Sequence, residues 1–400
     1  MAPWLSIIGV TEAGPKALQM DAVAAIARSS LVVAAPRFHN DLADMVEKNA
    51  SIIAFPSPLR NVYPVLHAAA HGHVTVLATG DPLWFGIGAS LVAEFGADAC
   101  AIIPNVSGLQ LAAAQMGWPL AATEIVSIHG RAPETILRHL YPRARLLVIG
   151  EDADSPAKAA ALLCECGYGA AVITILSHLG NDRGGRFVTI AQNLHEGIYD
   201  DQPEIQDFHI MAIACPDHHP HTGGPAMLDK DIENDGKLTK ADLRASAITK
   251  LNPFSGAIIW DLGAGSGAVA IDFMRRAPRT RGFAIDRDDR QIDMARRNAA
   301  KFGVPSLQHI KADLPGGLAG LPVPDAVFLG GGICDEVIAC AVAQLRGGGA
   351  LLAHAVTVES EMLLVASWRK YGGNLTRIAV NHANPVGGYH GWRPLMPVTQ

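Results

Sequence analysis

The sequence has few charged residues and no excess of positive charge. Charged side chains make up 18% of its 400 residues, and the formal net charge is −6. Without a basic surface, nucleic acid is excluded as an expected partner. An anionic substrate would have to be attracted by local arginine, lysine and histidine side chains, because the overall field is negative.

Cysteine is scarce too, and it forms no metal-binding or disulfide pattern. The six cysteines contain no CxxC pair, so we expect reduced thiols packed in a cytoplasmic protein. The segment Met1–Val10 lacks the basic region of a secretory signal, and no apolar run reaches membrane-spanning length. We expect a cytoplasmic location, no membrane contact and no metal.

The sequence is rich in aliphatic residues and glycine. Hydrophobic residues make up 49% of it, and their short runs alternate with helical patterns, which predicts α/β layers. The runs that we expect to form strands in the first half are Leu5–Val10, Leu31–Ala35, Val74–Ala78, Leu146–Gly150, Ala171–Leu176 and His209–Ala214. A chain of this length exceeds what one hydrophobic core usually organises, so we expect more than one domain.

The composition changes abruptly after Cys215. The following Pro-Asp-His-His-Pro-His-Thr-Gly-Gly-Pro is typical of a linker. We predict a first domain over 1–215, a linker over 216–228 and a second domain over 229–400. The proline and glycine residues leave no scaffold to fix ligand geometry, which argues against a metal cluster made of His209, His218, His219 and His221.

The segment Asp231–Asp242 nearly matches a calcium-binding EF-hand loop. It has acids at positions 1, 3, 5 and 12 and glycine at position 6. Asp242 is too short for the usual bidentate contact at position 12, and a Pro/Gly-rich stretch precedes the loop where a helix would be needed. We predict instead a turn at Asp235-Gly236 and a helix capped near Thr239.

A glycine-rich turn in the second half is the clearest sign of a ligand. The run Gly263–Ala268 fits GxGxxG/A, in which the backbone approaches a ligand at a helix N-terminus. Asp261 precedes this run, and Asp286 and Asp313 follow the next two predicted strands. Acids at three successive strand ends suit a cationic ligand with an amine, a ribose diol and an adenine, and suit a pyrophosphate poorly. The pattern therefore favours S-adenosylmethionine (SAM) over NAD.

The rest of the second half fits the same sheet. Segments 325–332 and 349–355 are predicted as its fourth and fifth strands. Segments 375–382 and 392–398 are predicted as a hairpin that closes the sheet. Between its arms, 383–391 is predicted as a flexible loop that can cover a flat substrate.

Three stretches of the first half, 8–15, 77–86 and 103–110, place small residues after predicted strands. They resemble the tetrapyrrole methylases of cobalamin and sirohaem synthesis, which implies a two-lobed class III methyltransferase fold with SAM between the lobes. The cofactor-binding residues implied by the resemblance are Gly80, Asp81, Trp84, Ser107 and Gly108. Glu12 departs from this family's pattern where a proline is common, and Asn105 where a glycine is usual.

The second half resembles a precorrin methyltransferase that also decarboxylates a ring acetate. The motifs that carry this resemblance are Leu238–Lys240, Trp260–Gly267, Phe328–Gly332, Ala355–Glu359 and Trp392–Thr399. It implies a Rossmann-like class I SAM methyltransferase fold. The cofactor-binding residues on this view are Thr239, Asp261, Gly263, Ala264, Gly265, Ser266, Gly267, Asp286, Asp313 and Leu314.

The order of the halves resembles the fused, decarboxylating precorrin-6Y C(5,15)-methyltransferase family of aerobic cobalamin synthesis. This implies two SAM sites, a small-molecule tetrapyrrole substrate, a homo-oligomer and transient contacts with neighbouring pathway enzymes. The first half would methylate carbon 5 of precorrin-6B. The second would methylate carbon 15 and decarboxylate the ring C acetate, giving precorrin-8x. The alternatives are an NAD-dependent precorrin reductase and a non-catalytic tetrapyrrole carrier.

Methyl transfer to a meso carbon asks little of protein nucleophiles. The reduced tetrapyrrole is already nucleophilic there, and positioning supplies much of the rate, so no catalytic residue is predicted. Arg393, His382 and His390 are candidates for binding substrate carboxylates, and solvated loop side chains are an equally good interpretation. Glu359 and Glu361 are proton-handling candidates, but helix-start carboxylates stabilised by the helix dipole are the better interpretation.

Overall fold

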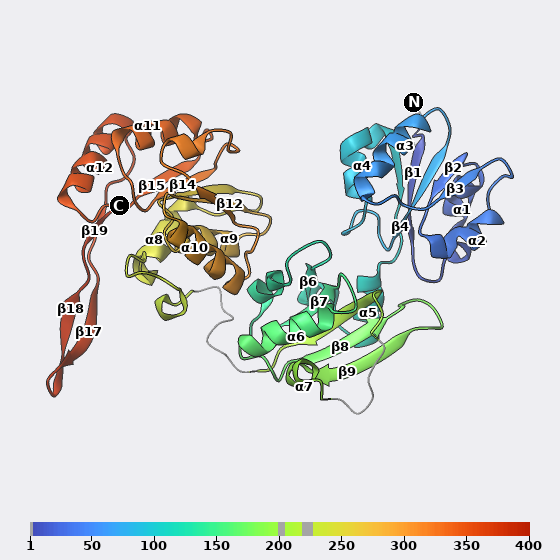
Figure 1. Cartoon of the computed structure of the whole chain (residues 1–400), viewed down its shortest axis with the longest axis horizontal. Helices are drawn as coiled ribbons and strands as arrows, with labels where there is room; N and C mark the ends of the chain where they lie inside the picture. Colours follow the sequence, from blue (N-terminus) through green and yellow to red (C-terminus); the bar gives the residue numbers. More distant parts are fainter. Residues whose placement is uncertain (1–2, 199–204, 218–226) are drawn as a thin grey trace. The chain divides into compact units, whose positions relative to one another are not determined.

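The computed structural model describes residues 3–198, 205–217 and 227–400 (Figure 1). The chain divides into two compact units. One contains residues 1–131 and 143–218, and the other contains residues 132–142 and 219–400. Most of the predicted linker, with His218, His219 and His221, lies outside the described residues. In the described part of the chain, no helix has the length and apolar composition needed to cross a membrane.

The first lobe of the first unit is a parallel sheet in the order β3-β2-β4-β1-β5. Its strands are β1 (Leu5–Val10), β2 (Leu31–Val33), β3 (Ser51–Ile53), β4 (Val74–Thr79) and β5 (Cys100–Ile103). Its helices are α1 (Met20–Ala27), α2 (His39–Ala43), α3 (Val62–Ala68) and α4 (Gly88–Phe95), with 3-10 turns η1 (Pro15–Ala17), η2 (Pro36–Phe38), η3 (Leu59–Asn61) and η4 (Ala97–Ala99). Leu5 and Ile7 pack toward α3 and α4, whereas Ile8 and Val10 pack toward α1 and α2. Both faces of β1 are buried, so its sequence is a continuous apolar run.

The second lobe is a mixed sheet in the order β6-β7-β10-β8-β9, in which only β6 and β7 pair in parallel. Its strands are β6 (Glu124–Ser127), β7 (Arg145–Ile149), β8 (Val172–Ser177), β9 (Gly185–Ile190) and β10 (His209–Ala214). Its helices are α5 (Gly108–Met116), α6 (Ser155–Glu165) and α7 (Ala191–Glu196), with η5 (Leu120–Ala122). All six apolar runs predicted as strands in the first half form strands.

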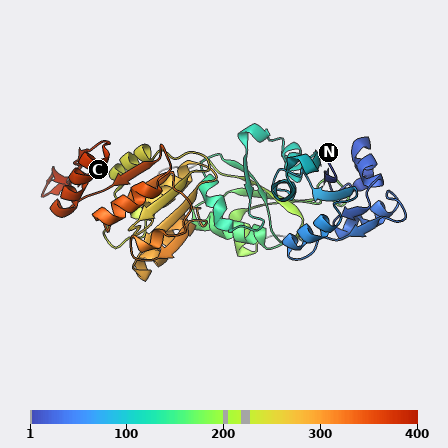
Figure 2. The same ribbon diagram turned by 90° about the horizontal axis from the view of Figure 1, so that it is seen from above.

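The second unit contains a parallel sheet in the order β13-β12-β11-β14-β15 (Figures 1 and 2). Its strands are β11 (Ile258–Leu262), β12 (Arg281–Asp286), β13 (Gln308–Lys311), β14 (Ala326–Leu329) and β15 (Ala350–Ala353). Its helices and turns are η6 (Pro133–His139), η7 (Asp229–Asp231), α8 (Ala241–Leu251), α9 (Ala268–Arg276), α10 (Asp289–Lys301), η8 (Gly316–Leu318), α11 (Asp335–Gln344) and α12 (Val358–Tyr371). This order is that of a Rossmann-like half, with the switch point beside β11.

Two separate cores cover the two faces of this sheet, because successive strand residues point to opposite sides. Ile259 packs with α8, α9 and α10. Its neighbour Trp260, which is fully buried, packs with α11 and α12. The predicted α/β class is confirmed for both units.

Two predictions for the C-terminal tail differ from the structure. It forms β16 (Arg377–Ile378) paired with β19 (Val398–Thr399), and β17 (Asn381–Val386) paired with β18 (Tyr389–Pro394). The predicted loop 383–391 is therefore mostly strand, with its turn at Gly387-Gly388. The hairpin β17–β18 does not join the five-stranded sheet as predicted. Just after β15, an isolated β-bridge joins Ala355 to Thr399 of β19, and the side chain of Gln400 contacts that of His354.

Candidate functional site

The glycine turn after β11 adopts a backbone that side chains would disturb. Gly263, Gly265 and Gly267 all have positive φ, at 66°, 54° and 73°. A Cβ atom on Gly263 would lie 2.8 Å from the carbonyl oxygen of Gly331, in the loop after β14. Only glycine allows two loops to approach so closely in this conformation.

Beside this turn lies a cavity of about 440 Å³ at the carboxyl ends of the strands. Open α/β sheets bind ligands at this position. Eight of the residues predicted for the second cofactor site line the cavity: Thr239, Gly263, Ala264, Gly265, Ser266, Asp286, Asp313 and Leu314. The structure thus brings together residues that the sequence distributes over three strand ends and the segment before α8.

Asp261 and Gly267 are not on the cavity lining. Asp261 is 1% exposed and lies beneath the turn, where its Oδ2 accepts a hydrogen bond of 3.0 Å from the amide of Ala270. Side chains alternate between the two faces of the sheet along β11. Because Trp260 and Leu262 face α11, the Asp261 side chain faces α9. Burial raises the pKa of Asp261 to about 7, against the opposing effect of the Ala270 hydrogen bond.

Asp286 is the carboxylate that shapes the rim of the cavity. Its Oδ2 accepts a hydrogen bond of 3.0 Å from the amide of Gly265, and its Oδ1 accepts one of 3.1 Å from the amide of Asp288. The side chain thus connects the end of β12 to the glycine turn. Asp313, after β13, is exposed at the same edge.

Sequence reasoning missed Gln291, which also lines this cavity from α10. Its Nε2 donates to Asp235 over 2.8 Å. Its Oε1 is buried, and among the described residues it has no hydrogen-bond partner. A buried acceptor without a partner is costly, so Gln291 indicates a ligand that supplies a donor. Its position in the first turn of the helix that follows Asp286 was the available signal.

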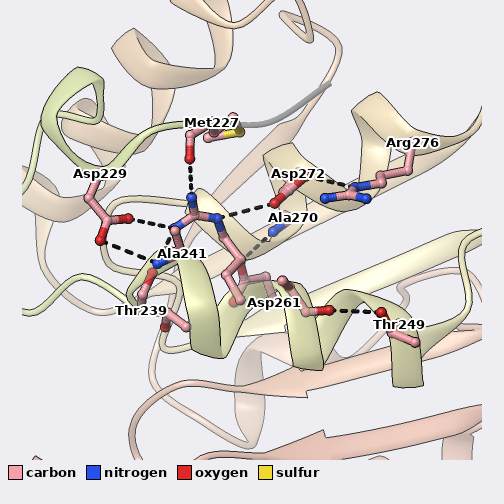
Figure 3. A network of polar contacts seen from close by, with 11 residues as sticks. Met227, Asp229, Thr239, Ala241, Thr249, Asp261, Ala270, Asp272 and Arg276 are labelled. Carbon is pink, nitrogen blue, oxygen red and sulfur yellow. Dashed lines mark hydrogen bonds and ion pairs between the residues drawn. The ribbon is translucent and has the colours of Figure 1, made fainter. Parts of the chain in front are cut away.

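A buried arginine, also missed, holds the cavity's supporting elements together. Arg244 on α8 is 1% exposed, and its guanidinium donates to Asp272 on α9 over 3.2 Å and to Asp229 over 3.2 Å. It also donates to the carbonyl oxygens of Thr239, over 2.7 Å, and of Met227. Figure 3 shows these partners gathered around one guanidinium. Arg244 therefore ties the cavity residue Thr239 to the helix that follows the glycine turn.

The EF-hand-like segment is a turn that leads into this region. Asn234 and Asp235 accept hydrogen bonds from the amides of Gly236 and Lys237, respectively, as the predicted turn requires. Helix α8 begins at Ala241 with Lys240 at the N-cap, one residue after Thr239, so the helix starts near the predicted position but without a side-chain capping bond. In the described ranges, no group of three or more His, Cys, Asp or Glu side chains could hold a metal ion.

The first unit contains a second cavity, of about 510 Å³. All five residues that the tetrapyrrole methylase resemblance implied line it: Gly80, Asp81, Trp84, Ser107 and Gly108. Two of them hold loops in shape. Asp81 accepts hydrogen bonds from the amides of Leu83 and Trp84, and Ser107 forms a capping box with Gln110 at the start of α5.

Asn105, one of the two departures from the family pattern, joins the loops around this cavity. Its Nδ2 donates to the carbonyl oxygen of Gly9 over 3.0 Å. A Cβ atom on Gly9 would lie 2.4 Å from the carbonyl oxygen of Gly80. The end of β1 and the loops after β4 and β5 are therefore in close contact, and the asparagine side chain fits between them where the family commonly has glycine.

The remaining candidates lie away from both cavities. His382 and Arg393 form a cross-strand pair on the hairpin, where His390 is also exposed. His382 is 3.6 Å from the carboxylate of Asp242. At the start of α12, Glu361 forms an ion pair with Arg377, and Glu359 is exposed. None of these five candidates lines either cavity.

Comparisons with known proteins assign each half of the chain. Residues 5–188 match the family model of tetrapyrrole (corrin/porphyrin) methylases, and residues 230–400 match that of the precorrin methyltransferase domain. The precorrin-6Y C(5,15)-methyltransferase [decarboxylating] of a Sinorhizobium species is 35% identical over 405 residues, covering 100% of this chain and 96% of that protein. The protein of the same name from Mycobacterium tuberculosis H37Rv is 34% identical over 326 residues, covering 81% of each.

A solved structure matches the second half. The C-terminal domain of precorrin-6Y C5,15-methyltransferase from Rhodobacter capsulatus is 31% identical, covers 44% of this chain and 96% of that chain, and has a TM-score of 0.42. The full-length similarity to the Sinorhizobium protein and the order of the two matched families confirm the predicted kinship and the two predicted fold types. The chain belongs to the precorrin-6Y C(5,15)-methyltransferase (decarboxylating) family.

Proposed function

We propose that the chain is a SAM-dependent methyltransferase of cobalamin biosynthesis that methylates a precorrin at carbons 5 and 15 and removes a carboxylate from it. The observation that carries the proposal is a cavity in each unit, each lined by the residues that the sequence motifs had indicated. Similarity to relatives named for this activity, over 100% and 81% of the chain, supports the same conclusion.

Each cavity would hold one SAM. In the second, Asp286 and Asp313 are acceptors for ribose hydroxyl groups and for the amino group of the cofactor, and the buried Oε1 of Gln291 is an acceptor without a donor. The glycine turn allows the backbone to approach the ligand. In the first, Trp84 offers an apolar surface, and the loops at Gly80 and Ser107 offer backbone groups. These donor and acceptor sets fit the cofactor.

When bound, SAM supplies an electrophilic methyl group on a sulfonium. The residues of the chain have to place an already nucleophilic substrate carbon in line with that methyl group and exclude water, which accounts for much of the rate. For the decarboxylation, the bond between the methylene and carboxylate carbons of the acetate breaks, carbon dioxide leaves, and the electron pair moves into the macrocycle. The methylene carbon then takes up a proton and becomes a methyl group. An apolar environment around the departing carboxylate favours the loss of carbon dioxide.

The deciding experiment uses the full chain with one cavity impaired at a time. Gly80→Val and Asp286→Ala would each be incubated with SAM and precorrin-6B, and the product mass measured. We expect Gly80→Val to lose one methyl addition and to keep the decarboxylation. We expect Asp286→Ala to add one methyl without losing carbon dioxide. Circular dichroism would check that both variants are folded.

Two other results would overturn the proposal. Oxidation of a nicotinamide cofactor without SAM consumption by the wild-type chain would support the precorrin reductase instead. Tetrapyrrole binding with turnover of neither cofactor would support a carrier.

We further propose that the chain forms a homo-oligomer through the tail. The hairpin and the segment that follows it carry large, exposed apolar side chains, Val386, Tyr389, Trp392 and Met396, which are 61–83% exposed. Exposed apolar groups of this kind mark contact surfaces. Light scattering on Trp392→Ser should then show a smaller particle than the wild-type chain. An unchanged mass would remove this argument for the interface.

A further inference from the structure

The first cavity contains a buried carboxylate that the predicted cofactor loops do not explain. The side chain of Glu12, which follows β1, is only 2% exposed. Its Oε1 lies 2.7 Å from Nε of Arg37, and its Oε2 lies 3.4 Å from Nδ1 of His178. A buried charge is tolerated only when it is paired. Glu12 is therefore built into a cluster in which its main partner is Arg37.

The guanidinium of Arg37 is held on several sides. Nη2 donates to Oγ1 of Thr79 over 3.2 Å, in addition to the Glu12 contact at Nε. Its central carbon lies 4.5 Å from the ring centroid of Phe38 and 5.1 Å from that of Phe208. Aromatic faces stabilise a planar cation. Arg37 is thus fixed in orientation before any ligand arrives.

One part of this guanidinium is left for a ligand. The Arg37 side chain is 37% exposed and lines the cavity. Among the described residues, its Nη1 has no hydrogen-bond partner. Arg37 is also the only arginine or lysine among the described residues that line this cavity. Among the described lining residues, it is the one side chain with a permanent positive charge that an anionic ligand group could pair with.

The charges of the cavity lining indicate which kind of anionic group would bind there. Besides Glu12, the cavity is lined by the acidic residues Asp81, Glu151 and Asp207. A phosphate, with close to two negative charges, would be repelled by this set. A carboxylate carries one charge and matches the planar fork of an arginine.

We propose that Arg37 binds a ligand carboxylate in the cavity of the first unit and that Glu12 and His178 position its guanidinium. The inference rests on the proposed function, which supplies two ligands with carboxylates, the tetrapyrrole and the methionine part of SAM. It gives the unusual Glu12 a role. The cluster draws Glu12, Arg37 and Thr79 from the first lobe and His178 and Phe208 from the second, so the carboxylate would be bound between the two lobes.

The test uses the full chain carrying Asp286→Ala, so that SAM binding reports the first cavity. Calorimetry would compare Arg37→Gln with its parent for SAM and for S-adenosylmethioninamine, which lacks the carboxylate. Kinetics would give kcat and KM for the tetrapyrrole in the single methylation. Loss of a hydrogen-bonded charge predicts an effect of about 10- to 100-fold on the carboxylate-bearing ligand.

The outcomes distinguish the two ligands, SAM and the tetrapyrrole, that could supply the bound carboxylate. If SAM binds more weakly and S-adenosylmethioninamine is unaffected, Arg37 binds the cofactor carboxylate. If SAM binding is unchanged while KM for the tetrapyrrole rises and kcat does not fall, Arg37 binds the substrate. If both ligands bind as before, within about twofold, the inference is wrong. If the parent binds no SAM at all, the proposed first site fails, and the inference fails with it.

Three further variants keep the result interpretable. Arg37→Lys keeps the positive charge but loses the planar guanidinium. We therefore expect it to bind the carboxylate-bearing ligand more tightly than Arg37→Gln and more weakly than the parent. The double variant Glu12→Gln/Arg37→Gln leaves no unpaired buried charge, and it should show the same ligand-specific loss if Arg37→Gln alone does not fold. Arg60→Gln, at an exposed position of the same lobe, is the matched control and should change neither constant.

Discussion

The two cavities are built in different ways. In the second unit, the lining comes mainly from the ends of neighbouring parallel strands, between Gly263 and Gly332, with Lys237 and Thr239 added from the segment before α8. In the first unit, the lining joins positions as far apart as Thr11 and Ile210, from two different sheets. One cavity follows from the topology of a single sheet, and the other from the packing of two lobes.

The difference shows which interactions each cavity depends on. The second is supported by buried polar side chains, with Arg244 bound to Asp272 and with Asp261 under the glycine turn. In the first, the buried charge of Glu12 lies in the cavity wall itself. Mutations should therefore damage the second unit mostly through stability and the first mostly through ligand binding.

The largest effect is expected for Arg244→Met. The change leaves Asp272, which is 3% exposed, without its buried partner and frees the carbonyl oxygens of Met227 and Thr239. Breaking a buried ion pair by removing one partner costs about 3–5 kcal/mol. Chemical denaturation should show this loss in the second unit alone. Equal destabilisation of both units would contradict the comparison.

Arg276→Met is the matched control for this prediction. Arg276 binds the other oxygen of the same Asp272 over 3.1 Å, but it is 39% exposed and four residues away on the same helix. Because Arg276 reaches solvent and Asp272 keeps its buried partner Arg244, we expect a loss of under about 1 kcal/mol. A loss as large as that of Arg244→Met would show that burial is not the deciding factor.

Asp261→Asn should change how stability depends on pH. The folded-state pKa of Asp261 is raised to about 7 by burial, from an ordinary value of 3.8. The folded state therefore holds the proton more tightly, and the carboxyl's stabilising contribution, complete below pH 4, is lost as pH rises toward 7. The loss amounts to up to about 4 kcal/mol. Asparagine cannot ionise and keeps an acceptor for Ala270.

The measurement is the free energy of unfolding in urea at pH 4 and pH 7. Relative to wild type, Asp261→Asn should gain stability between the two values. Asp293→Asn, at an exposed position on α10, should show no such gain. A constant difference between Asp261→Asn and wild type would mean that burial does not raise the pKa of Asp261 above its value in the unfolded chain.

Gly263→Ala tests the close approach of the two loops. The positive φ and the contact of 2.8 Å with the carbonyl oxygen of Gly331 make any side chain strained there. We expect a cost of about 1–3 kcal/mol and loss of the decarboxylating methylation, with the other methylation kept. Gly347→Ala is the control, because open space surrounds a Cβ at that position. Loss of both methylations would show that the two sites depend on each other.

The sequence allowed more of the second cavity to be predicted than of the first. Acids and glycines at strand ends are local patterns, and eight of ten predicted residues line the cavity. Asp261 lies below the lining because its side chain points toward α9. Predicting this would have required knowing which face of the sheet each helix covers. Arg244 and Gln291 belong to helices with no motif, and their partners are distant in sequence.

In the first unit, the loop residues were found by resemblance, but the cluster around Glu12 was not. Glu12 and His178 are 166 positions apart and belong to different lobes. Three of the five strands of the second lobe, β7, β8 and β10, were predicted from their apolar runs, whereas β6 and β9 were not. The mixed strand directions were not predicted either, because burial on both faces gives the same run in parallel and antiparallel strands. Contacts between lobes leave no local pattern to detect.

The smallest effect is expected for Glu361→Gln. This residue lies outside both cavities, in the first turn of α12, and is paired with Arg377 at the protein surface. Removing the pair and the favourable helix-dipole contact should cost under about 1 kcal/mol. Because the second site is predicted to depend on positioning by its cavity, kcat for methylation at carbon 15 should stay within about twofold of wild type. A drop of about 100-fold, as removal of a general acid or base produces, would place proton handling on α12 and extend the second site beyond its cavity.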